Sequence, residues 1–227
     1  RYVMHVDSDD LLPRDSVRLL VEAAEQTGAD IVDGGFADWE NGKVSTLHHA
    51  CRDSHHKYQR KLLCQNITSN RIWGRIYRKS LLESHGIYSI EGIDYSEDYA
   101  VVARAMYFAR RHVIDDIVYY YRKDNITSYT HDISEKNLTS HFKACQLVAS
   151  FIQQQDPKGK YRTATDIGMV NAYRTAAEHI PLSQVDRICT YHVSHPLCRL
   201  CIALLRRGWK VKHVNWLYLP FRRLYNL

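Results

Sequence analysis

The feature that most constrains the fold is a hydrophobic run that ends in a cluster of acids and leads through a helix into a second hydrophobic run. Residues 2–6 have the composition of a short strand, which ends at Asp7. Apolar residues then recur at helical spacing from Val17 until Gly28, a residue that often terminates a helix. Residues 29–36 read as a second strand. A strand–helix–strand unit predicts an α/β protein with a parallel sheet that is covered on both faces.

The rest of the chain predicts strands and helices up to about residue 130 and helices alone after it. Residues 37–60 are polar and rich in histidine, which predicts a loop. The first strand lacks the neighbours that a buried parallel strand needs, so we expect the sheet to be incomplete at the N-terminus. The expected strands are 71–78 and 113–122, and the expected helices are 58–64, 80–85, 97–111, 138–154, 163–179 and 197–207.

Four acidic or polar residues, Asp7-Ser8-Asp9-Asp10, follow the first strand directly. In α/β proteins the carboxyl ends of the strands border the crevice that binds ligands. Asp7 and Asp9 are two positions apart, so an extended backbone points them the same way, and such oxygen ligands suit Mg²⁺ or Mn²⁺ together with substrate phosphates. The alternative is that these aspartates only cap the following helix, a role that Asp10 suits well.

Two further motifs carry candidate functional residues. Glu97 and Asp98 open a predicted helix, where the helix dipole keeps a carboxylate ionised; such a group is either a general base or merely a stabilising charge. Trp73 precedes Gly74, and we consider it equally suited to stacking on a donor sugar and to packing in the core. His131 is a weaker candidate for an additional metal ligand.

These motifs occur in the order typical of bacterial family 2 glycosyltransferases of the GT-A fold, which the chain resembles over about residues 2–130. The matching stretches are the strand with Asp-Ser-Asp-Asp and Leu-Leu-Pro, then Gly-Ala-Asp-Ile-Val, Asn-x-x-Trp-Gly-x-x-Tyr-Arg, Glu-Asp-Tyr and Tyr-Tyr-Tyr-Arg. The resemblance implies a GT-A-like (Rossmann-like) mixed sheet with flanking helices. It divides the chain into the catalytic part, residues 1–130, and a helical C-terminal extension, residues 131–227.

The resemblance also implies an inverting enzyme that uses a nucleotide-diphosphate sugar and a divalent metal, Mn²⁺ or Mg²⁺. Asp7 would lie near the nucleoside, and Asp9, with Asp7 beside it, would hold the metal on the diphosphate. Arg122 would meet the diphosphate. Asp98 would deprotonate the acceptor hydroxyl, and Glu97 would help to place the acceptor.

The expected function is transfer of a sugar to a glycan or lipid-linked acceptor in the synthesis of cell-surface polysaccharide. Such enzymes begin with a strand, a Ser-rich turn and an acidic residue that hold the nucleobase, and this segment is missing ahead of the strand that ends at Asp7. This difference leaves open a truncated, non-catalytic module of the same fold that binds a sugar or a partner. A metal-dependent phosphoester hydrolase is a further alternative, although the second carboxylate pair fits acceptor activation better.

Charge is unevenly distributed along the chain. The net charge is +6, yet the segment from Arg187 onward holds eight Lys and Arg and no Asp or Glu, which leaves residues 1–186 with 23 basic against 25 acidic residues. A basic terminal segment favours contact with an anionic surface and gives no support to nucleic-acid binding by the whole chain.

The tail over residues 196–227 combines an apolar stripe, cations and aromatic rings. It is either a helix packed on the rest of the protein with a solvated basic face or, as we favour, a helix that binds an anionic membrane surface. The residues concerned are Leu197, Leu200, Cys201, Leu204 and Leu205, then Arg199, Arg206, Arg207, Lys210 and Lys212, and finally Trp209, Trp216, Tyr218, Phe221 and Tyr225.

Six cysteines are scattered through a chain too large to depend on disulfides, so we expect them to be reduced and mostly buried. No uncharged apolar run approaches the roughly 20 residues that cross a bilayer. These observations predict a cytoplasmic protein that is peripheral, through its tail, on the inner face of the cell membrane.

Overall fold

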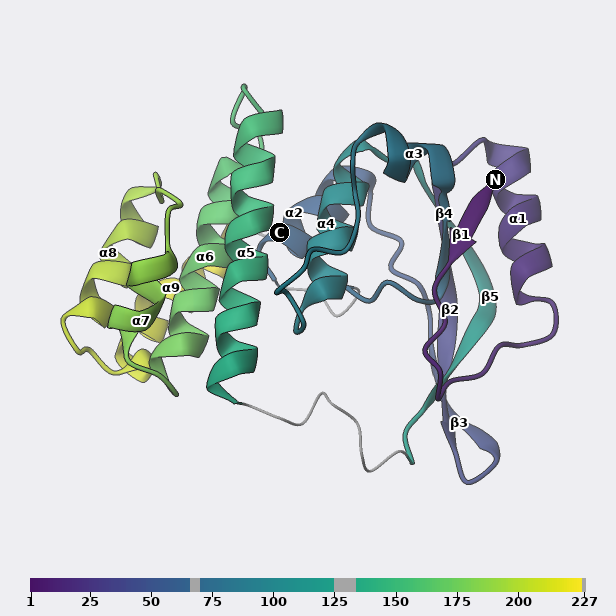
Figure 1. Cartoon of the computed structure of the whole chain (residues 1–227), viewed down its shortest axis with the longest axis horizontal. Helices are drawn as coiled ribbons and strands as arrows, with labels where there is room; N and C mark the ends of the chain where they lie inside the picture. The colour runs from purple at the N-terminus through teal and green to yellow at the C-terminus, as the bar shows by residue number, and fades with distance from the viewer. Residues whose placement is uncertain (66–69, 125–133, 226–227) are drawn as a thin grey trace. The chain divides into compact units, whose positions relative to one another are not determined.

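The computed structural model describes residues 1–65, 70–124 and 134–225 and divides the chain into two compact units (Figure 1). The first, which we call the α/β unit, contains a sheet, and the second, the helical unit, is built from helices. Both units draw on separate stretches of the chain. The α/β unit comprises Arg1–His55, Ser69–Tyr88 and Ala105–His131, and the helical unit comprises His56–Thr68, Ser89–Arg104 and Asp132–Leu227.

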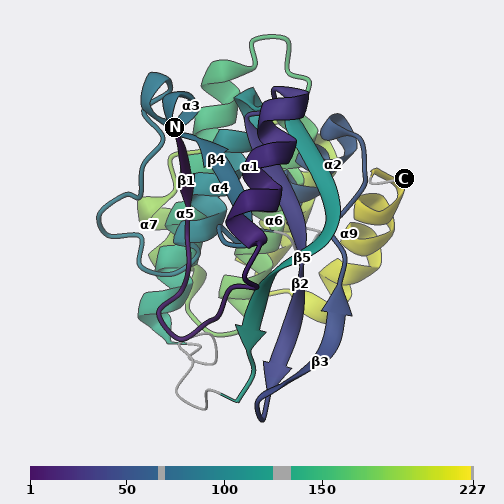
Figure 2. The ribbon, with the colours of Figure 1, turned by 90° about the vertical axis from the view of Figure 1, so that its right-hand side faces the viewer.

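The sheet of the α/β unit is mixed. Its order is β1-β4-β2-β3, and β5 pairs with β2. The β2–β5 pair is parallel, whereas β4 is antiparallel to both β1 and β2, so the first two strands are not direct neighbours (Figure 2). The mixed GT-A-like sheet is therefore confirmed, and a purely parallel one is excluded. The strands are β1 (Tyr2–Met4), β2 (Ile31–Glu40), β3 (Lys43–His48), β4 (Arg75–Arg78) and β5 (Arg111–Arg122).

The loop predicted over residues 37–60 is wrong for most of its length. β2 continues to Glu40 and turns back into β3 through Asn41 and Gly42, which both have positive φ (50° and 76°). Asn-Gly between two strand-like segments is a strong hairpin signal because these residues tolerate that conformation. The side chains of β3 are mostly exposed, and the polar composition of this strand led to the prediction of a loop.

One face of the sheet is covered by α1 (Ser16–Thr27). Leu20 and Ala24 of this helix pack against Val32, Ile76 and Val118 of three strands, and all five side chains are buried. The helix ends where the backbone enters the left-handed region at the next residue, a glycine, as the sequence predicted. The short helix α3 (Lys79–Ser84) follows β4 in the same unit.

A buried ion cluster joins the three central strands. Asp33 on β2 lies 2.9 Å from Nε of Arg75 on β4 and 2.5 Å from Nε of Arg111 on β5, and all three side chains are nearly inaccessible. Burial opposes ionisation of the Asp33 carboxyl, but the two guanidinium groups outweigh it and lower its pKa. The cluster therefore fixes the strands that carry the residues described below.

The helical unit packs α5 against α6, and α6 against α8 and α9. At Gly168 the backbone of α6 approaches the end of α2 so closely that a Cβ would lie 2.3 Å from the carbonyl oxygen of Leu63. A glycine is required there because any side chain would clash with backbone. The helices are α2 (His55–Leu63), α4 (Glu97–Phe108), α5 (Glu135–Gln155), α6 (Arg162–Ala177), α7 (Leu182–Ile188), α8 (Pro196–Arg206) and α9 (Val211–Tyr225). Of α4, only the part up to Arg104 belongs to this unit.

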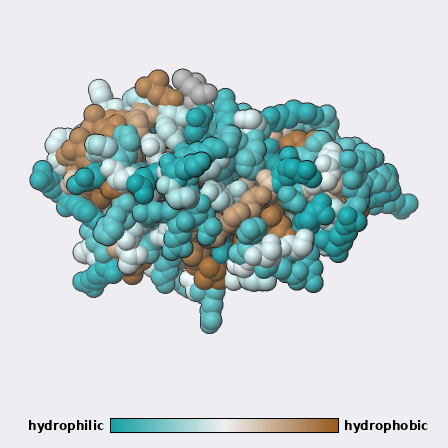
Figure 3. All heavy atoms as spheres, turned by 90° about the horizontal axis from the view of Figure 1, so that it is seen from above, coloured by the Kyte–Doolittle hydropathy of each residue, from teal (hydrophilic) through white to brown (hydrophobic). Residues whose placement is uncertain are grey.

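The apolar stripe predicted in the tail is only partly available to a membrane. Cys201 and Leu205 of α8 and Tyr218 of α9 are buried within the helical unit, so the packed-helix interpretation holds for them. Other apolar side chains face solvent, and Figure 3 shows apolar surface gathered over the end of the unit that α8 and α9 form. The side chains concerned are Leu200, Trp209, Trp216, Leu217 and Leu224.

All six cysteines are free thiols, four of them buried, as predicted. Across the described stretches of the chain, none of the helices has both the length and the hydropathy needed to cross a membrane.

Candidate functional site

The Asp7–Asp10 motif forms a turn two residues beyond β1, which ends at Met4 and is therefore shorter than the strand predicted over residues 2–6. The backbone N–H of Asp10 donates to the carbonyl of Asp7 at 3.1 Å, and the side chains of Asp7 and Asp9 are exposed. Two of the carboxylates of the motif, those of Asp7 and Asp9, are accessible to solvent, whereas the third, that of Asp10, is buried.

The buried member, Asp10, anchors the turn on β5. Its carboxylate accepts one hydrogen bond from the Tyr119 hydroxyl and one from the backbone N–H of Arg122, both at 2.8 Å. Burial raises the pKa of Asp10, against the opposing effect of these two hydrogen bonds. Because α1 begins only at Ser16, Asp10 does not cap that helix, which corrects the alternative considered from the sequence.

Tyr119 holds the turn at two points. Its hydroxyl also accepts a hydrogen bond from the backbone N–H of Asp7 at 3.0 Å, and the next residue of β5, Tyr120, exchanges two backbone hydrogen bonds with Leu11. Sequence reasoning singled out the Tyr-Tyr-Tyr-Arg motif but assigned no role to its first tyrosine. A tyrosine that faces a carboxylate across 109 residues leaves no local signal.

Trp73 belongs to a packed aromatic cluster. It is 9% exposed, stacks on Tyr119 and Tyr121 at centroid distances of 4.4 and 5.5 Å, and meets the edge of Phe36. The guanidinium of Arg71 lies 4.9 Å from the Trp73 ring. Packing is the role of Trp73 that these contacts establish, and stacking on a donor sugar stays a prediction.

The predicted diphosphate ligand, Arg122, lies at the end of β5. Its backbone binds Asp10, while its side chain is 42% exposed and makes a long ion pair with Asp124, with Nε and Oδ1 3.7 Å apart. The α/β unit thus brings the Asp7–Asp10 turn, Trp73 and Arg122 to neighbouring positions through Tyr119.

Glu97 and Asp98 occupy the first turn of α4 in the helical unit. The side chain of Glu97 is exposed and that of Asp98 is partly exposed. The dipole of a helix stabilises negative charge at this end, so both carboxyls are well placed to remain ionised.

A divalent metal would have few protein ligands at the turn. Within residues 1–65, 70–124 and 134–225, no three His, Cys, Asp or Glu side chains converge as a metal site. The exposed oxygens of Asp7 and Asp9 nevertheless fit Mg²⁺ or Mn²⁺, which proteins commonly hold by one or two carboxylates plus substrate phosphates. His131 lies outside the described residues.

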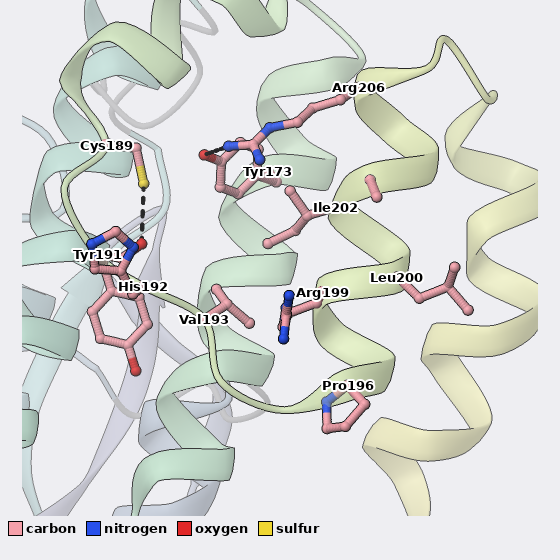
Figure 4. A pocket seen from close by; sticks show the side chains of 11 residues that line it. Tyr173, Cys189, Tyr191, His192, Val193, Pro196, Arg199, Leu200, Ile202 and Arg206 are labelled. Carbon is pink, nitrogen blue, oxygen red and sulfur yellow. Dashed lines mark hydrogen bonds between the residues drawn. The ribbon is translucent and has the colours of Figure 1, made fainter.

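Two of the hollows in the surface of the helical unit lie beside charged side chains. The larger, of about 710 Å³, lies between α6, α8 and the 189–193 segment, and Arg199 and Arg206 border it from one face of α8 (Figure 4). Asp186 neutralises Arg206, with Nη2 and Oδ1 2.6 Å apart. The smaller, of about 520 Å³, is lined by residues 92–94 and the first turns of α5, next to the segment that leads into Glu97.

Comparison with known proteins gives a family match over part of the chain and a likeness in fold. The family model for glycosyl transferase family 2 matches residues 1–86. The chain is similar in structure to S. aureus TarS 1–349 in complex with UDP, with 16% identity and a TM-score of 0.57 over 98% of this chain and 67% of that one. It is similarly close to TarS 1–349 in complex with UDP-GlcNAc, with 16% identity and a TM-score of 0.59 over 98% and 68%.

A further structure of S. aureus TarS shares 14% identity and gives a TM-score of 0.56 over 96% of this chain but only 39% of that one. At these identities the likeness shows the fold. No curated protein sequence matches the chain. The family match over residues 1–86 and the likeness to solved structures together support a family 2 glycosyltransferase, and the likeness shows that the chain has a GT-A-like fold.

Proposed function

We propose that this chain takes part in the transfer of a sugar from a nucleotide-diphosphate sugar to a hydroxyl of a glycan or lipid-linked acceptor, with inversion at the anomeric carbon. The observation that carries the proposal is the Asp7–Asp10 turn, which exposes two carboxylates while a third anchors it on β5. This turn lies within the residues that match the glycosyltransferase family. We assign the pathway to the synthesis of cell-surface polysaccharide.

On the donor side, Asp7 contacts the nucleoside, and Asp9, with help from Asp7, holds Mn²⁺ or Mg²⁺. Such an ion, when bound, neutralises charge on the leaving diphosphate. Arg122 contributes a further positive charge from the end of β5, where its side chain is partly exposed. Because TarS structures contain UDP and UDP-GlcNAc, a uridine-diphosphate sugar is the first donor to test.

On the acceptor side, Asp98 acts as the general base. As the acceptor oxygen attacks the anomeric carbon, its proton passes to the Asp98 carboxylate, the bond to the diphosphate breaks, and the nucleotide leaves with the electron pair. One displacement inverts the configuration and needs no covalent intermediate. Glu97, on the same helical turn, helps to place the acceptor.

The hollow beside residues 92–94 provides a place for the acceptor within the helical unit. Its charged lining is balanced, with Asp94 and Glu135 against Lys136 and Lys143, and Lys136 pairs with Asp94 at 3.1 Å. Thr139 and Ser140 add hydroxyls to the lining. Balanced donors and acceptors suit a neutral, hydroxyl-rich sugar better than a strongly charged ligand.

Titration calorimetry tests the donor half of this proposal. We expect the full-length protein to bind UDP-GlcNAc or UDP in the presence of Mn²⁺, with affinity lost on chelation, and to transfer sugar to an acceptor. Metal-dependent binding without transfer or hydrolysis would instead favour the non-catalytic module. Hydrolysis of the donor in preference to transfer would favour the phosphoester hydrolase.

We further propose that α9 places the protein on an anionic membrane surface. Trp216 and Leu224 are 83% and 70% exposed, and the spacing of Lys212, Trp216 and Arg223 puts them on one side of the helix. Each cation near an anionic leaflet contributes about 1 kcal/mol, and exposed aromatic rings suit the interface. Charge attraction of this kind weakens as salt is raised.

Sedimentation with phosphatidylglycerol vesicles at low salt tests this placement. We expect the double variant Trp216→Ser/Leu224→Ser to lose most binding, because it removes the two most exposed apolar side chains of the helix. Leu47→Ser, which changes a leucine on β3 that is 56% exposed, is the control and should bind like the wild type. Equal sedimentation of wild type and double variant would contradict the proposal.

A further inference from the structure

The residue before the Glu97–Asp98 pair has an unusual backbone. Ser96 has φ of 66°, in the left-handed region that residues other than glycine rarely adopt. Its carbonyl accepts the first hydrogen bond of α4, from the N–H of Ala100 at 3.1 Å. The direction in which α4 starts, and with it the direction of both carboxylates, therefore depends on a conformation that costs free energy unless neighbours hold it.

Two consecutive residues of α5 hold this segment. The hydroxyl of Ser140 accepts a hydrogen bond from the N–H of Tyr95 at 2.9 Å and lies 3.1 Å from the Tyr95 carbonyl, to which it donates. The Nδ1 atom of His141 lies 2.8 Å from the hydroxyl oxygen of Ser96. One residue of α5 thus fixes the backbone of Tyr95, and the next fixes the side chain of Ser96.

The His141 side chain is half-buried, and burial lowers its pKa to about 4. A neutral ring with its proton on Nε2 satisfies both of its contacts. Nδ1 then accepts from the Ser96 hydroxyl, and the Nε2–H group faces the sulfur of Cys145, 3.6 Å away. A protonated ring would present two donors and leave the Ser96 hydroxyl without an acceptor on this side.

The contacts continue from Cys145 into the helical unit as a chain of hydrogen-bonded side chains. The side-chain amide of Gln65 donates to the sulfur of Cys145 at 2.7 Å, and Asn171 donates to the side-chain oxygen Oε1 of Gln65 at 2.7 Å. Arg174 donates to Asn171 at 2.9 Å and to Asn215 of α9 at 2.6 Å. Gln65 thus fixes the Cys145 side chain, which in turn restrains rotation of the His141 ring away from Ser96.

We propose that Ser96, Ser140 and His141 are positioning residues, which hold the start of α4 so that Asp98 faces the acceptor hydroxyl. The catalytic part of this inference rests on the proposed function, because it assumes that Asp98 is the base. The structural part stands on the hydrogen bonds alone. It assigns a role to a half-buried histidine, His141, and to Ser96 with its left-handed backbone, neither of which the transfer reaction itself uses.

Hydrogen exchange of the full-length protein tests the structural part without reference to activity. In His141→Ala and Ser96→Ala, we expect the Ala100 amide to exchange at least tenfold faster, because the first turn of α4 frays. His141→Asn should retain most of the protection, since its side-chain oxygen can lie where Nδ1 lies. Tyr161→Phe, which removes a hydrogen bond to His56 elsewhere in the unit, is the matched control and should leave this amide unchanged. Unchanged exchange in both alanine variants would overturn the proposal.

Transfer kinetics test the catalytic part. We expect both alanine variants to lower kcat at least tenfold with little change in KM for the donor, and His141→Asn to recover most of the loss. Wild-type kcat in the alanine variants, in an enzyme that Asp98→Asn inactivates, would overturn the positioning role. Wild-type kcat in Asp98→Asn itself would overturn the proposed function. The exchange measurement would still decide whether Ser96 and His141 hold the start of α4.

Discussion

The two acidic motifs are held in place by different chemistry. The Asp7–Asp10 turn is anchored by one of its own carboxylates, Asp10, and the sheet beneath it contains the buried ion cluster around Asp33. The start of α4 is held by neutral groups on another helix, Ser140 and His141. Removing a buried charge from the first site should cost much stability, whereas the hydrogen bond of His141 at the second site should depend on the protonation state of its ring.

The largest effect on stability is expected in the ion cluster. Asp33→Asn leaves Arg75 and Arg111 buried without their counter-charge, and breaking a buried pair in this way costs about 3–5 kcal/mol. Denaturant unfolding measures the change. Asp30→Asn, which alters a partly exposed ion pair with Arg78 in the same unit, should cost much less. Similar losses in the two variants would show that the buried cluster contributes no more to stability than the partly exposed ion pair.

An intermediate effect is expected at the anchor of the turn. Tyr119→Phe removes the hydroxyl that binds both the Asp10 carboxylate and the N–H of Asp7, and we expect a loss of about 2 kcal/mol. The aromatic contact with Trp73 should survive because the ring is retained. Thermal unfolding and metal-dependent UDP binding would be measured together. A variant with full stability and full affinity would show that the turn needs no anchor on β5.

The smallest expected effect is the pH dependence of stability that His141 contributes. Burial depresses the folded-state pKa of His141 to about 4, below its unfolded value. At a pH between these two pKa values, the unfolded chain binds a proton on His141 and the folded chain does not. Stability should therefore fall as pH drops from 7 towards 4, with a slope of at most about 1.4 kcal/mol per pH unit from this group. Cys145 beside it does not titrate in this range, because burial raises its pKa to about 12.

The variant His141→Asn isolates this contribution. Carboxyl groups titrate in both proteins and cancel in the comparison, so the variant should gain stability relative to the wild type as pH is lowered. Denaturant unfolding at pH 7, 6 and 5 measures the difference. A difference that stays constant with pH would show that the His141 pKa is not depressed.

Sequence reasoning located both motifs because each is a short run of acids next to a recognisable strand or helix. It could not find their supports, since Tyr119 lies 109 residues from Asp10 and His141 lies 45 residues from Ser96. Nothing in either neighbourhood reveals such a partner until the chain is folded. The hairpin at Asn41 and Gly42 is different, because its turn signal was present and was outweighed by the polar composition around it.

The central claim is that one motif holds the donor and the other performs the chemistry. Its most direct test measures donor affinity and transfer rate on the same preparations of wild type, Asp9→Asn and Asp98→Asn. We predict that Asp9→Asn loses metal-dependent donor binding, and that Asp98→Asn keeps it while transfer falls by roughly 10²–10⁴-fold, the usual contribution of a general base. A near wild-type transfer rate in Asp98→Asn, or full metal-dependent binding in Asp9→Asn, would contradict this division of roles.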